Sequence, residues 1–489
     1  MADNPMQAFV RVGQDYPAKR SAEDRNRDFL EIARRYENKK AREQSSRCAQ
    51  CGVPYCATHC PLHNHIPDWL RLTAEGRLRE AYELSNATST MPEICGRICP
   101  QDRLCEGNCV IEFSGHGAVT IGAVEKYITD TAWDEGWVEP VQVLADRGQS
   151  VGVIGAGPAG LSAAERLRSR GYEVHVYDRH DRLGGLLVYG IPSFKLEKKV
   201  IDRRVERLRE AGIVFHTEFE VGRDATLDEL RQRHDALLIA TGVYKPRAIK
   251  VPGVGLPGVV DALDYLVMSN RKGYGDPVPQ FDEGGFDAKG KNVVVIGGGD
   301  TAMDCVRTAI RQGAKSVKCL YRRDRANMPG SQREVANAEE EGVEFVWLSA
   351  PEAFEGSGEG LGRVSAVRAA RMRLGAPDAS GRRAPELEPD SEFRLEADLV
   401  IKALGFDPED LPTLFGAEEL SVTRWGTLRI DHKSMQTNME GVFAAGDIVR
   451  GASLVVWAIR DGIDVAERMH GWLKERPPVA ATADARVAA

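Results

Sequence analysis

The sequence has little that is typical of a membrane, secreted or nucleic-acid-binding protein. No apolar run approaches the ~20 residues that cross a bilayer, and the N-terminal residues carry no apolar core of the kind found in secretion signals. The net charge of −8 at pH 7 provides no basic footprint for nucleic acid. We therefore expect a soluble, cytoplasmic protein that binds neither nucleic acid nor a membrane.

Cysteine is scarce beyond residue 109, where only Cys305 and Cys319 occur. A disulfide reductase needs a redox pair near its flavin, usually spaced C-x2-C or C-x4-C, whereas 13 residues separate these two cysteines. This spacing disfavours disulfide reduction and predicts that both cysteines are core residues.

The other eight of the ten cysteines lie between residues 48 and 109, in two groups. The groups read Cys48-x2-Cys51-x4-Cys56-x3-Cys60-Pro61 and Cys95-x3-Cys99-Pro100-x4-Cys105-x3-Cys109. In a reducing cytoplasm such a dense group favours metal binding over disulfides. Bacterial ferredoxins follow a similar logic, in which the last cysteine of a run ligates the other cluster. Two sets of four thiolates suit two 4Fe-4S clusters.

Zinc is the competing interpretation of these cysteines, because structural zinc sites also use four thiolates in closely spaced pairs. Only Cys48 and Cys51 have the C-x2-C spacing that zinc sites usually repeat. A disulfide framework is a further alternative. His59, His63 and His65 beside the cysteines are either additional ligands or polar loop residues.

The stretch from residue 151 to 185, VGVIGAGPAGLSAAERLRSRGYEVHVYDRHDRLGG, predicts a dinucleotide-binding turn between a strand and a helix. Gly155 allows the tight turn, Gly157 lets backbone amides approach a pyrophosphate, and Gly160 lets the helix pack close to the strand. Asp178 ends the next strand, where it would hydrogen-bond a ribose hydroxyl. The alternative is an ordinary glycine-rich turn without a ligand, which would not explain the strand, the helix and the acid that accompany it.

A second pattern of the same kind begins at residue 291, KNVVVIGGGDTAMDCVRTAIR, with small residues at Gly297, Gly299 and Ala302. The strand after it ends at Arg322 and Arg323 instead of at an acid. Arginines pair with a 2′-phosphate, whereas an acid accepts a hydrogen bond from a free 2′-hydroxyl. This half therefore predicts an NADPH site, with an ordinary pair of surface arginines as the alternative.

The apolar segments ALLIATG at residues 236–242 and DLVIKALG at 398–405 repeat one pattern, so the chain contains the same nucleotide-binding half twice. Residues 351–400 read as an antiparallel hairpin. GVFAAGD at 441–447 places an acid after a further strand, where it can hydrogen-bond the ribityl or pyrophosphate region of a flavin.

These patterns predict an α/β fold with a helical iron-sulfur N-terminal domain followed by two Rossmann-like dinucleotide-binding domains, the NADPH domain being inserted into the FAD domain. The expected boundaries are 1–148 for the helical domain, 149–285 and 408–476 for the two parts of the FAD domain, 286–407 for the NADPH domain and 477–489 for a flexible tail. The charged stretch 17–47 is expected to form a solvated helix.

With GAGPAG, ATG, GGGDTA, ALG and AAGD in this order, the chain resembles the flavoprotein reductases that bind two dinucleotides. Together with the eight cysteines, residues 20–475 resemble the small (beta) subunit of NADPH-dependent glutamate synthase and the N-terminal half of dihydropyrimidine dehydrogenase. The resemblance implies that NADPH reduces FAD and that two 4Fe-4S clusters pass single electrons to a large (alpha) subunit in a hetero-oligomer. That subunit makes L-glutamate from L-glutamine and 2-oxoglutarate.

Two other functions stay open at this point. One is an electron-transfer subunit of a dihydropyrimidine dehydrogenase or ferredoxin-NADP transhydrogenase type of complex, because the acceptor lies on the partner. The other is a binding or assembly subunit with vestigial nucleotide folds, against which the intact glycines of both turns argue.

The resemblance also implies the site residues, and it implies no catalytic side chain because the cofactors carry the chemistry. One cluster would be held by Cys48, Cys51, Cys56 and Cys109, and the other by Cys60, Cys99, Cys105 and either Cys95 or Glu125, the latter standing where dihydropyrimidine dehydrogenase has a glutamine. FAD would be held by Ala156, Gly157, Ala159, Asp178, Gly185, Leu186, Lys195, Val221, Gly446 and Asp447. NADPH would be held by Gly298, Gly299, Asp300, Thr301, Arg322, Arg323, Ala403, Leu404 and Gly405.

Overall fold

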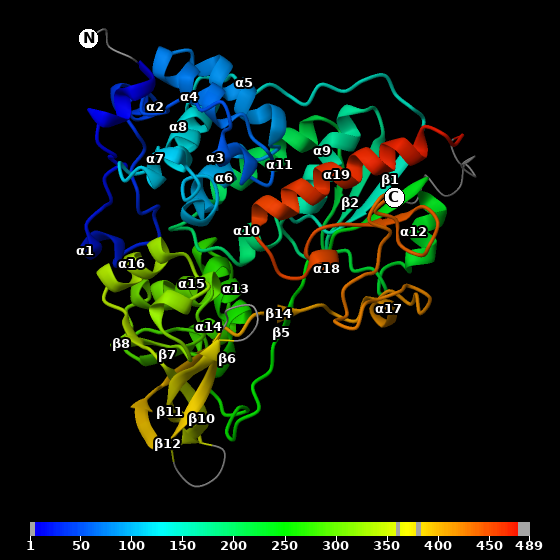
Figure 1. The fold of residues 1–489 in the computed structure, drawn as a ribbon. Helices are drawn as coiled ribbons and strands as arrows, with labels where there is room; N and C mark the ends of the chain where they lie inside the picture. The colour runs from blue at the N-terminus through cyan, green and yellow to red at the C-terminus, as the bar shows by residue number, and fades with distance from the viewer. Residues whose placement is uncertain (1–4, 358–361, 378–382, 478–489) are drawn as a thin grey trace.

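The computed structural model describes residues 5–357, 362–377 and 383–477, which form a helical unit and two α/β units (Figure 1). The helical unit contains η1 (Pro5–Val10), α1 (Ala22–Arg25), α2 (Asn38–Ser45), α3 (Tyr55–Thr58), α4 (Ile66–Glu75), α5 (Leu78–Thr88), α6 (Pro92–Ile98), η2 (Gln101–Arg103), α7 (Val110–Phe113) and α8 (Ile121–Asp134). Across the described ranges, no helix has the length and apolarity needed to cross a membrane.

The central helix of this unit is α8, which buries a stripe of side chains against its neighbours. Ile121, Val124 and Ile128 recur at the spacing of one helix face and are buried. The other long helices have local start and stop signals, such as the proline in the first turn of α4 and the left-handed Gly76 (φ 85°) at its end. Short helices joined by turns leave loops in which cysteines can converge.

The expectation of one solvated helix over residues 17–47 is wrong. Only the four residues of α1 and the eight of α2 are helical there, and the chain between them is irregular. Arg25 is 2% exposed because it is paired with carboxylates of the third unit. Charged residues of this stretch are therefore paired with another unit and do not form the solvent-exposed face of a helix.

The flavin unit, as we call the α/β unit that follows the helical one, has a five-stranded parallel sheet in the order β15-β4-β1-β2-β3. Its strands are β1 (Ser150–Ile154), β2 (Glu173–Tyr177), β3 (Val214–His216), β4 (Ala236–Ile239) and β15 (Val442–Ala444). Its helices are α9 (Pro158–Ser169), α10 (Leu186–Tyr189), α11 (Lys198–Glu210), α12 (Leu227–Arg233), α17 (Leu411–Leu414), α18 (Asp447–Arg450) and α19 (Val455–Leu473).

The nucleotide unit, the third one, repeats this plan with the order β6-β13-β7-β8-β9. Its strands are β6 (Val259–Asp261), β7 (Asn292–Ile296), β8 (Ser316–Leu320), β9 (Glu344–Val346) and β13 (Leu399–Lys402). Its helices are α13 (Ala262–Gly273), α14 (Pro279–Asp282), α15 (Asp300–Arg311), η3 (Arg325–Asn327) and α16 (Gln332–Glu340). The strands β1 and β7, which precede the two glycine turns, are each flanked on both sides by parallel strands, as in other doubly wound sheets.

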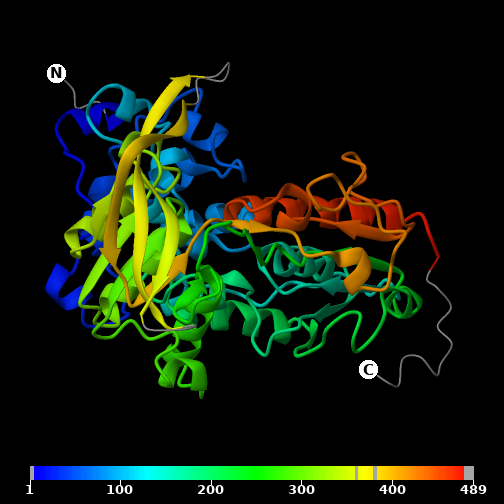
Figure 2. The same cartoon turned by 90° about the horizontal axis from the view of Figure 1, so that it is seen from below.

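The two α/β units are joined by a short antiparallel ladder of β5 (Lys245–Pro246) and β14 (Phe406–Asp407). The strands β10 (Ser349–Gly356), β11 (Val364–Pro377) and β12 (Arg383–Glu396) form a separate antiparallel sheet at the lower end of the nucleotide unit in Figure 1, which lies in front of that unit in Figure 2. Antiparallel strands were expected here, but they begin at residue 349 and include β10 as a third strand.

The expected boundary between residues 285 and 286 falls inside the nucleotide unit. The strand β6 pairs with β13, and α13 packs in the same hydrophobic core as α15. We therefore place the start of this unit after β5, the first strand of the ladder. The expected tail lies outside the described residues from residue 478 onward.

Candidate functional site

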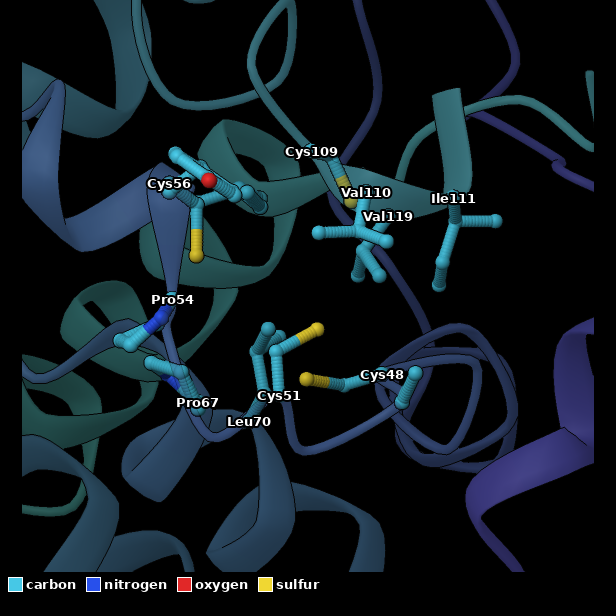
Figure 3. Close-up of a pocket in the computed structure, with 13 residues that line it drawn as sticks. Cys48, Cys51, Pro54, Cys56, Pro67, Leu70, Cys109, Val110, Ile111 and Val119 are labelled. Carbon is cyan, nitrogen blue, oxygen red and sulfur yellow. The ribbon is translucent and has the colours of Figure 1, made fainter. Parts of the chain in front are cut away.

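The first cysteine pocket lies within the helical unit and brings together Cys48, Cys51, Cys56 and Cys109. Their sulfur atoms point into a shared space (Figure 3). Cys56 is carried by α3 and Cys109 stands at the start of α7, so both cysteine groups of the sequence contribute to one pocket. These are the four cysteines that the resemblance implied for one cluster.

Four cysteine side chains around one pocket form a ligand set that fits an iron-sulfur cubane. Burial raises the pKa of Cys48 to about 11 and that of Cys56 to about 12, so a thiolate at either position needs a nearby cation. Throughout residues 5–357, 362–377 and 383–477, no three cysteine, histidine or carboxylate side chains converge closely enough for a single metal ion.

The second cysteine pocket brings together Cys60, Cys95, Cys99 and Cys105. Cys95 lies on α6 and Cys99 ends that helix, and a hydrogen bond between the two thiols, together with burial, raises the pKa of Cys99. The indole of Trp69 lines the same pocket from α4. Four sulfur donors are therefore collected here from three separate segments of the chain.

Glu125 lines this second pocket as well, so both candidates for the fourth ligand are present. Its Oε1 accepts hydrogen bonds from Asn64 Nδ2 at 3.0 Å and from Ser85 Oγ at 3.4 Å. Burial raises the pKa of the carboxyl to about 8. Both hydrogen bonds reach Oε1, and the Cys95 thiol has Cys99 as a partner, so Cys95 and Glu125 both remain candidates for the fourth ligand.

The first glycine turn is shaped by close backbone contacts. A side chain at Gly155 (φ 105°) would lie 2.5 Å from the carbonyl oxygen of Ala240, and one at Gly160 would lie 1.9 Å from that of Gly155. At Gly157 nothing lies within 4 Å. The turn is thus tight at its ends and open in the middle, where an anion can approach the start of α9.

The carboxylate of Asp178 faces this turn from the end of β2. It accepts hydrogen bonds from the backbone N–H of Ala156 at 2.7 Å and from that of His180 at 2.9 Å. It lines a pocket with Val221, as the resemblance implied for both. Asp178 therefore fastens the glycine turn in addition to facing the expected ribose position.

The same pocket has walls that sequence reasoning missed. Tyr244 lines it together with Asp178, and the guanidinium of Arg179 lies 4.8 Å from the ring centroid of Tyr244. Arg179 also pairs with Glu409, which belongs to the second stretch of the flavin unit. The position of Tyr244, two residues after the end of the ATG motif, was the available signal.

Two further glycines bring distant segments to the turn. A side chain at Gly185 (φ 55°) would lie 3.0 Å from Cα of Gly157, and one at Gly446 (φ 78°) would lie 3.0 Å from Cβ of Ala159. Leu186 begins α10 and Asp447 begins α18, so both adjoin the same place. Burial raises the pKa of Asp447, whose Oδ1 accepts a 2.6 Å hydrogen bond from Ser453.

Lys195 is engaged by the nucleotide unit. Its Nζ donates to Asp304 at 2.9 Å and lies 3.5 Å from Glu334. Burial alone would lower the pKa of this ammonium, but the two carboxylates raise it above its ordinary value. The side chain thus ties the loop after α10 to α15 and α16.

The second glycine turn has the same geometry as the first. A side chain at Gly297 (φ 147°) would lie 2.2 Å from the carbonyl oxygen of Ala403, and one at Gly298 would lie 2.3 Å from the ring of Tyr321. At Gly299 nothing lies within 4 Å. Asp300 and Thr301 begin α15 directly after this open position.

The segment after β13 completes the rim of the second turn. Leu404 follows Ala403, and Gly405 has a left-handed backbone (φ 94°) and accepts a 3.0 Å hydrogen bond from the N–H of Arg247. The structure therefore places all three residues beside the turn or the β5–β14 ladder.

Arg322 and Arg323 follow β8, which pairs with β7, the strand that leads into the second glycine turn. Arg322 is exposed, and Nε of Arg323 is buried with no hydrogen-bond partner among the described residues. Free donors on two adjacent guanidiniums are suited to a phosphate.

The two cysteines outside the pockets are buried in the core of the nucleotide unit, as expected. Cys305 Sγ lies 3.9 Å from the carbonyl oxygen of Ala262, and Cys319 Sγ lies 3.4 Å from that of Gly297. Neither lines the flavin-unit pocket or a cysteine pocket.

Two protein families match the chain in order. Residues 25–137 match the family described as dihydropyrimidine dehydrogenase domain II, 4Fe-4S cluster. Residues 149–462 match the family described as pyridine nucleotide-disulphide oxidoreductase. The boundary between the two matches falls in the linker that leads into β1.

Several curated relatives match nearly the whole chain. The glutamate synthase (NADPH) small chain of Azospirillum brasilense is 65% identical over 486 residues, which is 99% of this chain and 100% of the relative. The small chain of Escherichia coli is 45% identical over 97% of this chain and 100% of its own length. The putative oxidoreductase AegA of Escherichia coli is 46% identical over 96% of this chain but 71% of its own length.

Among solved structures, FprA of Mycobacterium tuberculosis in complex with NADPH is similar with a TM-score of 0.57. It is 20% identical and the match covers 70% of this chain and 88% of that one. At this identity the likeness concerns the fold of the two α/β units alone.

Proposed function

The chain belongs to the family of glutamate synthase (NADPH) small chains, and we propose on that basis that it carries electrons from NADPH to a large chain that makes L-glutamate from L-glutamine and 2-oxoglutarate. It is an NADPH-dependent flavoprotein oxidoreductase with FAD, NADPH and iron-sulfur cofactors. As a small chain it has a large chain as its partner.

The observation that carries the proposal is the contact between the second cysteine pocket and the flavin unit. Val456, at the start of α19, lines that pocket together with the cysteines. The first cysteine pocket is lined only by residues of the helical unit. We assign one 4Fe-4S cluster to each pocket, so that the second lies next to the flavin unit and the first lies farther along the route.

The residues of the two glycine turns bind and orient the dinucleotides. The first turn, with Asp178, holds FAD, and the second turn, with Arg322 and Arg323, holds NADPH. Bound FAD supplies the conversion of a two-electron donor into one-electron steps. Hydride transfer between stacked rings needs distance and alignment, so we assign no general acid or base.

The surface around the first cysteine pocket favours this direction of flow. Tyr55 and Val110 line the pocket and are 49% and 39% exposed, and the nearby Val53 and Phe113 are 64% and 72% exposed. A face with exposed apolar residues above a redox group is suited to docking a protein partner. We place the exit to the large chain there.

The test is anaerobic purification of the full chain from its native source, followed by metal, sulfide and partner analysis. We expect about eight iron atoms and eight sulfides per chain, a flavin spectrum bleached by NADPH, and co-elution of a large glutamine-hydrolysing polypeptide. Zinc without sulfide would contradict the cluster assignment. A dihydropyrimidine-reducing partner, which the family match of residues 25–137 makes the second candidate, would redirect the function.

A further inference from the structure

Asp102 and Arg103 bridge the second cysteine pocket and the nucleotide unit. They lie in η2, between two cysteines of that pocket. The Asp102 carboxylate accepts a hydrogen bond from Ser331 Oγ, with distances of 3.2 and 3.3 Å to its two oxygens. The guanidinium of Arg103 donates through Nη1 to the carbonyl oxygen of Pro329. A short segment of the helical unit is thus hydrogen-bonded to the loop that precedes α16.

That loop lies directly on the second glycine turn. The N–H of Gly330 donates to the carbonyl oxygen of Gly298 at 3.0 Å, and a side chain at Gly330 would lie 3.5 Å from the carbonyl carbon of Gly299. The N–H of Ser331 donates to Asp300 Oδ1 at 2.9 Å. Arg103 is therefore anchored to a backbone that touches the open position of the turn.

The guanidinium of Arg103 keeps donors for a further ligand. Its Nη2 forms a long ion pair with Asp300 Oδ2 at 3.8 Å, beyond hydrogen-bond distance, and the side chain is 41% exposed. Among the described residues, its hydrogen-bond acceptor is the single carbonyl of Pro329. A guanidinium offers five donors, and a phosphate takes two of them in a fork geometry. Asp300 would otherwise repel a pyrophosphate that approaches the start of α15.

We propose that Arg103 is a residue of the NADPH site, where it binds the pyrophosphate of the dinucleotide and offsets the charge of Asp300. The inference rests on the proposed role of the second glycine turn as the NADPH site. Its consequence is that the iron-sulfur unit supplies part of the nucleotide site. A nucleotide bound there would contact η2, which lies between two cysteines of the second pocket.

The test is the affinity of the full, cofactor-loaded chain for NADP⁺, measured by isothermal titration calorimetry. We expect Arg103→Gln to bind NADP⁺ about tenfold more weakly, which corresponds to ~1.4 kcal/mol, because charge-assisted hydrogen bonds to the pyrophosphate are lost, and Arg103→Lys to recover part of that loss. Adenosine 2′-monophosphate lacks the pyrophosphate, so its binding should be unchanged in both variants. NADP⁺ binding at the wild-type level in Arg103→Gln would overturn the inference.

The matched control is Asp102→Ala, which removes the neighbouring tie to Ser331 but no positive charge. We expect this variant to bind NADP⁺ at least as tightly as the wild type. An equal loss in Asp102→Ala and Arg103→Gln would assign the effect to a loosened contact between the units and overturn the role of Arg103. If the wild-type chain itself bound no NADP⁺, the proposed function would fail first, which keeps the two failures distinct.

Discussion

At the scale of single residues, the specificity for NADPH is assigned to two guanidiniums with free donors. Arg322 and Arg323 follow β8, whereas the nearby Arg325 is already paired with Glu339 at 2.7 and 2.9 Å. A 2′-phosphate can therefore bind to the first two without breaking an existing ion pair. Arg325 therefore serves as a control arginine, because its guanidinium already has a carboxylate partner.

We predict that replacing Arg322 and Arg323 together by alanine raises the KM for NADPH by about tenfold or more, since each lost charge-assisted hydrogen bond costs ~1.5–3 kcal/mol. The KM for NADH should change little, because NADH has no 2′-phosphate. Steady-state kinetics with both dinucleotides measure this, and Arg325→Ala should leave both constants unchanged. Equal losses for the two dinucleotides would refute the assignment.

His234 is a buried histidine whose neutral form is built into the flavin unit. Its Nδ1 lies 2.5 Å from Ser150 Oγ and its Nε2 lies 2.8 Å from the hydroxyl of Tyr177. Burial lowers its pKa to about 3, and the adjacent His175 and His216 lower it as well. In the folded chain the imidazole of His234 stays neutral down to about pH 3, whereas in the unfolded chain it takes up a proton below pH ~6.5. The stabilisation is therefore present above that pH and is lost as the pH falls toward 3.

We predict that the free energy of unfolding falls by roughly 2 kcal/mol between pH 7 and pH 5 through this residue, at ~1.36 kcal/mol per pH unit below 6.5. His234→Gln should flatten that part of the pH dependence, measured by denaturant unfolding at both pH values. The control His432→Gln, at an exposed position, should keep the wild-type slope. An unchanged slope in His234→Gln would show that other groups cause it.

Single residues also show where sequence reasoning stops. Gly155 and Gly297 could be assigned from the sequence because their role is local, in a turn between a strand and a helix. Lys195 was assigned to FAD by resemblance alone, whereas in the structure its ammonium is held by Asp304, which lies 109 positions along the chain. No local pattern reports a partner on another unit.

At the scale of elements, α15 and α16 are held to the rest of the molecule by buried charges. Glu341 is 2% exposed and accepts hydrogen bonds from Arg307, Arg311 and Arg25, the last of which comes from the N-terminal segment. The ring of Phe194 packs against two of these guanidiniums, at 4.6 and 3.9 Å. The charged stretch 17–47, which was expected to form a solvent-exposed helix, is thus part of the interface with the nucleotide unit.

We predict that Glu341→Ala destabilises the protein by about 3–5 kcal/mol, because it leaves buried guanidiniums without a carboxylate. Thermal unfolding should show a clearly lowered Tm. The control Glu344→Ala removes a carboxylate that is 62% exposed and pairs with Lys318, and it should cost less than ~1 kcal/mol. A similar Tm for both variants would mean that the buried network carries no net stability.

At the scale of the whole molecule, the order of the units could be predicted from the sequence, but their contacts could not. Each glycine turn and each cysteine group has its own local signature. The boundary at residue 285 was misplaced because β6 joins its sheet only through pairing with β13, far along the chain. The contact of Val456 with the second cysteine pocket likewise appears only in three dimensions. In the proposed electron route, that contact makes the second pocket the one next to the flavin unit.

The route predicts an asymmetry between the two cysteine pockets. In Cys51→Ala, which alters the first pocket, NADPH should still bleach the flavin and still reduce the cluster of the second pocket, while transfer to the large chain is lost. In Cys99→Ala, which alters the second pocket, NADPH should bleach the flavin but leave the first cluster oxidised, although dithionite reduces it. The flavin unit, which touches only the second pocket, is common to both variants and serves as the internal control.

Anaerobic NADPH titration followed by electron paramagnetic resonance distinguishes these states, since each variant retains one cluster signal. The expected difference depends on position alone, because the two pockets offer similar thiolates and differ in their distance from α19. If NADPH reduced the remaining cluster equally well in both variants, each pocket would have its own path to the flavin. The second cysteine pocket would then not be an obligatory relay, and the contact at Val456 would be structural.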